Sequence, residues 1–157
     1  MSKLKILHLE DSAQDAELVE AALAADGLDC VITLAEDEGS FRSQLKGGNF
    51  ELALSDYNLP SFNGLKAIKI FREINSETPF IFVSGAIGAD LAVQLMKEGA
   101  DDYVLKDKLI ELPGVVRRAL EECQERKRRQ KSEQLLIKIT DAVPGVVYQY
   151  KLLPDGT

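Results

Sequence analysis

The chain has 157 residues, 45% of them hydrophobic and 29% charged, so it can form one domain with its own core and is too apolar for a disordered segment. Acidic residues outnumber basic ones, and the formal net charge of -7 argues against general nucleic-acid binding. Two cysteines cannot form a disulfide framework, and no apolar run has the length of a membrane span or a signal peptide. We therefore expect a cytoplasmic protein that binds neither nucleic acid nor membrane.

Short apolar runs alternate with amphipathic stretches over the first 110 residues. In chain order, the predicted strands are Leu4 to Leu9, Val31 to Leu34, Leu52 to Leu54, Phe80 to Val83 and Tyr103 to Leu105. A helical pattern follows each of them, and Ser12 with Asp15 three residues later predicts the N-cap of the first helix. This alternation predicts an α/β fold with a five-stranded parallel sheet and helices on both faces. Right-handed crossovers favour the doubly wound, flavodoxin-like strand order 2-1-3-4-5.

One long helix is predicted after the last strand, because neither glycine nor proline occurs between Gly114 and Pro144. The segment Gln124 to Gln134 contains no apolar residue, and a helix that is polar all round usually bridges between domains. Seven basic and three acidic residues lie between Arg117 and Lys131. The interleaved acids and the absence of aromatic residues favour a solvated linker over a DNA contact, and the heptad pattern for a coiled coil is poor.

Charged and hydroxyl side chains follow four of the predicted strands: Glu10, Asp11, Asp56, Ser84 and Lys106. The carboxyl ends of parallel strands meet at one edge of the sheet, where ligands of open α/β sheets bind. Three neighbouring carboxylates repel one another, and Mg²⁺ would relieve this repulsion. A carboxylate can also act as a nucleophile and form an aspartyl phosphate, whose oxygens an ammonium and a hydroxyl would bind.

In this combination the motifs resemble the receiver domain of response regulators, over roughly residues 3 to 122. The segments that carry the resemblance are Ile6-Leu7-His8-Leu9-Glu10-Asp11, Asp56-Tyr57-Asn58-Leu59-Pro60, Asn63-Gly64-Leu65, Val83-Ser84-Gly85-Ala86 and Gly99 to Lys106. The resemblance implies a two-component phosphorelay, in which the receiver domain assigned to residues 1–122 takes a phosphoryl group from a phosphohistidine. The implied partner is a sensor histidine kinase or a phosphotransfer protein.

The resemblance also implies a role for each matching residue. Asp56 would be the phosphoacceptor, in a reaction that requires Mg²⁺. Glu10, Asp11, Asp56 and the backbone carbonyl of Asn58 would bind the metal ion. The domain would catalyse its own phosphorylation and dephosphorylation, without being a stand-alone metabolic enzyme.

Three further residues follow from the same resemblance. Ser84 would donate a hydrogen bond to the phosphoryl group and Lys106 would pair with it. Tyr103 matches the aromatic residue that turns inward on phosphorylation and thereby changes the face formed by the fourth helix, fifth strand and fifth helix. The sequence departs from the commonest family pattern at Asp107, where many receivers have proline. We therefore expect a trans peptide bond there, and a weak competition of Asp107 for the Lys106 charge.

The C-terminal part resembles a signalling linker, assigned to residues 123–141, that leads into the start of a PAS-like domain at residues 142–157. The motif that carries this resemblance runs from Asp141 to Tyr150. Receiver–PAS architectures most often continue into a histidine kinase and sometimes into a diguanylate cyclase, so a longer parent protein is expected. A homodimer through the C-terminal helix, or through the face that contains Tyr103, is a further expectation.

Other interpretations of the same residues remain. The leading alternative is an interaction or dimerisation module that works without phosphorylation. A flavodoxin-like nucleotide binder is disfavoured by the acidic loop after the first strand, and a haloacid-dehalogenase-type phosphatase by asparagine at position 58. His8 is interpreted as a core histidine rather than a metal ligand or a phosphorylation site.

Overall fold

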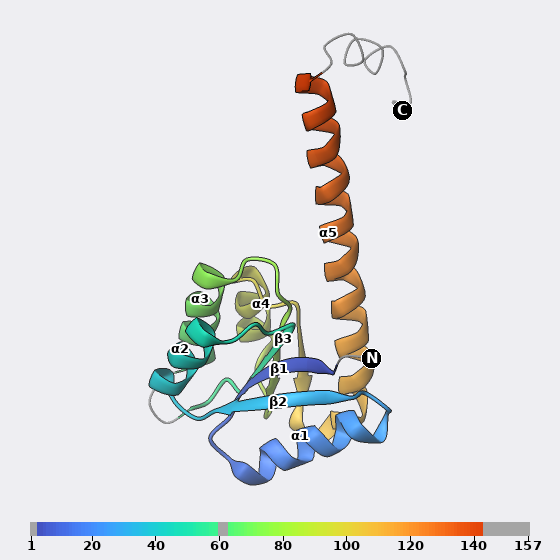
Figure 1. Cartoon of the computed structure of the whole chain (residues 1–157). Coiled ribbons are helices and arrows are strands. Elements are labelled where there is room, and N and C mark those ends of the chain that lie inside the picture. The colour runs from blue at the N-terminus through green and yellow to red at the C-terminus, as the bar shows by residue number, and fades with distance from the viewer. Residues whose placement is uncertain (1–2, 60–62, 143–157) are drawn as a thin grey trace. The chain divides into compact units, whose positions relative to one another are not determined.

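The computed structural model describes residues 3–59 and 63–142, with side-chain surroundings as far as residue 133 (Figure 1). The elements in chain order are β1 (Leu4–Leu9), α1 (Ala13–Ala25), β2 (Cys30–Ala35), α2 (Glu38–Gly47), β3 (Leu52–Ser55), α3 (Gly64–Ile74), β4 (Phe80–Ser84), α4 (Ala89–Lys97), β5 (Asp102–Leu105), a 3-10 helix (Lys106–Glu111) and α5 (Leu112–Ala142). The five strands form one parallel sheet in the order β2-β1-β3-β4-β5, which confirms the predicted fold class.

The register of the sheet brings the ends of the strands into line. Leu9 of β1 pairs with Ser55 of β3, so Glu10 and Asp56 each come one residue after a paired position. On the other side of β4, Ser84 pairs with Leu105, so Lys106 follows directly beside it. Parallel pairing therefore delivers the polar residues after β1, β3, β4 and β5 to one edge, as the sequence predicts.

Two apolar layers cover the two faces of the sheet. On one face, side chains of β1, β3 and β4 pack against α2, α3 and α4, and the rings of Phe71, Phe80 and Phe82 meet edge to face with centroids 5.1 and 5.0 Å apart. On the other face, Val19 and Leu23 of α1 join the first turns of α5. Figure 1 shows the same division of helices between the faces. Packing on both faces holds the strands in place, and with them the strand ends that carry the polar residues.

Local hydrogen bonds set the beginnings of the helices. Ser12 Oγ accepts a bond from the Asp15 backbone N–H, which confirms the predicted cap of α1. Asn63 caps α3 in the same way through Lys66 N–H, so α3 begins at Gly64. No cis peptide bond occurs among the described residues, so the bond after Lys106 is trans as expected, and a 3-10 helix continues from there.

The long C-terminal helix is present as α5, and Pro113 is tolerated at its second residue because the first turn needs no N–H partner. The chain forms two compact units, the first ending at Leu120 and the second beginning at Glu121, so α5 contributes to both. Among the described residues, no helix has the length and apolarity that a membrane crossing requires. The predicted PAS-like segment lies outside the described residues after Ala142.

Candidate functional site

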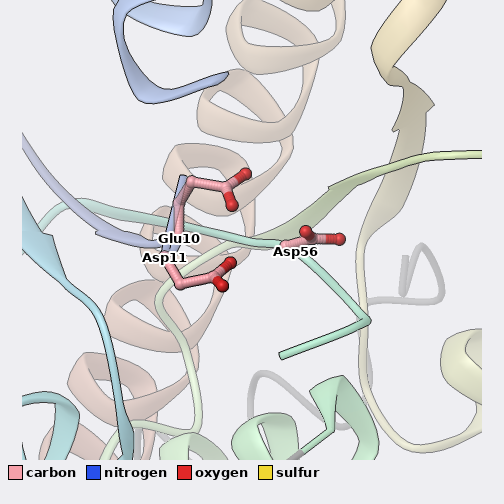
Figure 2. Close-up of side chains that lie close together, drawn as sticks. All are labelled: Glu10, Asp11 and Asp56. Carbon is pink, nitrogen blue, oxygen red and sulfur yellow. The ribbon is translucent and has the colours of Figure 1, made fainter. Parts of the chain in front are cut away.

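Three carboxylates gather at the carboxyl end of the sheet. Glu10 and Asp11 follow β1 and Asp56 follows β3, and one oxygen of each lies within 4.8 Å of the others (Figure 2). Glu10 and Asp56 are buried, whereas Asp11 is exposed. Burial raises the pKa of Glu10, and the neighbouring Asp56 charge acts in the same direction against the bonds from Lys106 and the Ser12 backbone. The cluster is therefore a concentration of negative charge on a rigid edge.

Hydrogen bonds hold both oxygens of the Asp56 carboxylate. Ser84 Oγ donates to Oδ1 at 2.8 Å, and the Asn58 backbone N–H donates to the same oxygen at 3.3 Å. Lys106 Nζ donates to Oδ2 at 2.9 Å. The side chain is fixed by residues from three different strand ends, and only 6% of the residue is exposed.

The Lys106 ammonium lies between three carboxylates. Its Nζ is 2.7 Å from Asp15 Oδ2, 2.8 Å from Glu10 Oε1 and 2.9 Å from Asp56 Oδ2. Burial disfavours the charged form, but the interactions with Asp15, Glu10 and Asp56 outweigh it and raise the pKa of Lys106. The ammonium is therefore a permanent counter-charge to the cluster.

Asp15 is the residue at this site that sequence reasoning missed. It lies in the first turn of α1 and reaches Lys106 across 91 positions of sequence. An acidic residue in a first helical turn is commonly explained by the helix dipole, so its type and position gave no separate signal. Asp107, the expected competitor for the Lys106 charge, is exposed and is not among the three carboxylates that hold it. The competing acid is Asp15.

His8 lies on β1, two residues before Glu10, and is fully buried. Burial, with a smaller contribution from the Lys106 charge, lowers its pKa from 6.5 to about 4 against the opposing charges of Asp56 and Asp15, so the ring is neutral at pH 7. Within the described part of the chain, neither ring nitrogen has a hydrogen-bond partner. This confirms the interpretation of His8 as a core residue.

Two predicted site residues lie away from the carboxylates or contribute only through the backbone. Tyr103 is on β5 opposite Phe82, and 40% of it is exposed. Asn58 is exposed, forms a bridge with Asn63 and contacts Asp56 through its N–H. The structure thus brings Glu10, Asp11, Asp56, Ser84 and Lys106 together, and leaves Tyr103 on the surface.

The donor set fits a hard divalent cation. Carboxylate oxygens are the protein ligands that Mg²⁺ prefers, and it usually takes only one or two of them with waters and phosphate oxygens. Glu10, Asp11 and Asp56 offer three such oxygens at mutual distances that one ion can bridge. The repulsion among them, opposed by the single ammonium, would favour such an ion.

Comparisons with known proteins identify this arrangement. The family model described as "Response regulator receiver domain" matches residues 6–117. The chain belongs to this family. Among curated relatives of this receiver, the cell cycle transcriptional regulator CtrA of Caulobacter vibrioides is 30% identical over 121 residues, covering 74% of this chain and 52% of CtrA. The transcriptional regulatory protein DltR of Streptococcus agalactiae is 33% identical over 103 residues, covering 66% and 45%. The chain therefore spans about half the length of these relatives.

Solved structures agree on the receiver fold. A receiver domain protein from Methanospirillum hungatei, described as CheY-like, matches with a TM-score of 0.70 and 22% identity, covering 80% of this chain and 99% of that one. The receiver domain of Francisella response regulator 1452 matches with a TM-score of 0.67 and 25% identity, covering 76% and 98%. The chain is thus a receiver domain of the response regulator type, consistent with a phosphoacceptor of two-component signalling.

Proposed function

We propose that Asp56 accepts a phosphoryl group from the phosphohistidine of a sensor histidine kinase or phosphotransfer protein. An Asp56 carboxylate oxygen forms a bond to phosphorus, the phosphorus–nitrogen bond of the phosphohistidine breaks, and the imidazole leaves as the partner's neutral histidine after taking up a proton. The observation that carries this proposal is the Asp56 carboxylate itself, fixed on one oxygen by Ser84 and on the other by Lys106. Positioning and charge neutralisation are what phosphoryl transfer requires.

The residues around Asp56 would divide the work of charge neutralisation. Glu10, Asp11 and Asp56, with the Asn58 backbone carbonyl, would hold Mg²⁺, which when bound neutralises charge on the phosphoryl oxygens. Lys106 would supply the second positive charge. The Ser84 hydroxyl, which donates to Asp56 Oδ1 in this structure, would turn its hydrogen bond to a phosphoryl oxygen.

The same hydroxyl would couple the site to the surface. Ser84 ends β4, and β5 beside it carries Tyr103, which is exposed here. Movement of Ser84 toward the phosphoryl group would open space into which the Tyr103 ring turns. This turn would change the surface formed by α4, β5 and α5, where Val93 and Met96 are also exposed.

Several finer assignments belong to the same proposal. They are the signalling linker at residues 123–141, the PAS-like start at 142–157, a downstream module regulated by both, and a homodimer through α5 or the Tyr103 surface. CtrA and DltR are transcriptional regulators. Since this chain covers only about half of their length, regulation of transcription is not carried over to it.

Intact mass spectrometry after addition of Mg²⁺ and acetyl phosphate tests the phosphoacceptor. We expect one added phosphoryl group on the wild type, none on Asp56→Asn, and none on the wild type when EDTA removes the metal. Asp90→Asn, which changes an exposed carboxylate on α4, serves as the matched control and should be phosphorylated like the wild type. A wild-type chain that binds Mg²⁺ but gains no mass would favour the phosphorylation-independent interaction module.

A further inference from the structure

The Lys106 ammonium is shared among three carboxylates in this structure. Its nitrogen donates hydrogen bonds to Asp15 Oδ2 at 2.7 Å and Asp56 Oδ2 at 2.9 Å. Glu10 Oε1 lies 2.8 Å away as an ion-pair partner without a hydrogen bond. A phosphoryl group on Asp56 would introduce new negative oxygens beside this ammonium, and they would compete with the three carboxylates for its single positive charge.

The three carboxylates differ in what their release would cost. The side chain of Glu10 is 1% exposed and that of Asp56 9%, whereas that of Asp15 is 34% exposed. A buried carboxylate that loses its counter-charge is strongly destabilised, because water cannot replace the lost interaction. Water can solvate a released Asp15. Asp15 is therefore the partner that Lys106 gives up most easily.

The geometry points to Asp15 as a positioning residue that competes with the incoming phosphoryl group for Lys106. This inference rests on the proposed phosphoacceptor function of Asp56. Before phosphorylation, Asp15 ties the ammonium to the first turn of α1. On phosphorylation, Lys106 exchanges Asp15 for a phosphoryl oxygen. Asp15 thus slows phosphoryl transfer, because it withholds the counter-charge that the transferred group needs.

The rate of phosphorylation of the 157-residue chain measures this competition. With Mg²⁺ and acetyl phosphate, and with intact mass as the readout, Asp15→Asn should react about three- to tenfold faster than the wild type. This is the size of effect expected for the loss of one partly exposed ion pair. Asp15→Glu keeps a carboxylate in reach of the ammonium and should return the rate toward that of the wild type. Thermal unfolding of each variant shows that the domain is folded.

A matched control separates a direct contact from a general effect of charge. Asp107→Asn removes an exposed carboxylate next to Lys106 in the sequence that does not hold the ammonium, so its rate should stay within about twofold of the wild type. Equal acceleration by Asp107→Asn, an unchanged or slower Asp15→Asn, or an Asp15→Glu rate equal to that of Asp15→Asn would each overturn the inference alone. A wild type that gains no phosphoryl group would instead remove the proposed function and this inference together.

Discussion

Replacement of His8 by leucine probes the buried environment on β1, two residues before Glu10. His8 is the one histidine of the chain, it is fully buried, and its ring nitrogens have no hydrogen-bond partner among the described residues. Burial lowers its pKa from 6.5 to about 4. Leucine has a similar size, no polar atoms and no charge, so His8→Leu removes the titration while filling the same space.

The sign and size of the effect follow from this pKa. The unfolded chain binds a proton at His8 near pH 6.5 and the folded chain only near pH 4, so acid favours the unfolded state between these values. At about 1.4 kcal/mol for each pKa unit, His8 lowers the free energy of unfolding by about 2 kcal/mol between pH 7 and pH 5. The raised pKa of Glu10 acts in the opposite direction, but this residue is present in both proteins. The difference between wild type and variant therefore isolates His8.

Urea unfolding followed by far-ultraviolet circular dichroism, at pH 7 and pH 5 in EDTA, gives the comparison. The wild type should lose about 2 kcal/mol more than His8→Leu on acidification, with equal denaturant slopes. Equal losses in the two proteins would refute the reasoning, since His8 would then carry a proton in the folded state or have a polar partner. His8→Leu should also be no less stable than the wild type at pH 7, because it buries no unsatisfied polar atom.

Two further substitutions test the packing and the metal site. Gly64→Ala should lower the free energy of unfolding by about 1–3 kcal/mol in the same urea assay, because its Cβ would lie 2.4 Å from a Phe82 ring carbon. Gly47→Ala, whose Cβ meets nothing within 4 Å, should be neutral or slightly stabilising, and equal losses at both glycines would contradict the argument. Asp11→Asn should weaken Mg²⁺ binding at least about tenfold by calorimetry, whereas Asp107→Asn should bind like the wild type. Unchanged affinity in Asp11→Asn would exclude this aspartate as a metal ligand.

Much of the fold follows from local sequence pattern. Phe80 to Val83 is a continuous apolar run, typical of a strand buried on both faces, and it forms most of β4. The alternation of such runs with helical spacing leaves few strand orders once crossovers are right-handed. Polar residues directly after buried strands then locate the site, because parallel strands end at a common edge. For this reason Glu10, Asp56, Ser84 and Lys106 could be placed together from sequence.

The contacts between these residues depend on distances that sequence separation does not encode. Only the packing of α1 against the sheet decides that Asp15 reaches Lys106, 91 positions away, while the adjacent Asp107 is exposed and is not one of its three carboxylate partners. The exposure of Tyr103 is likewise set by tertiary packing and could not be predicted from the sequence. The sequence by itself determined the strand order and the chemical character of the site. The tertiary structure decided which carboxylates share the one ammonium, because ion pairing depends on separations of a few ångströms between atoms far apart in the chain.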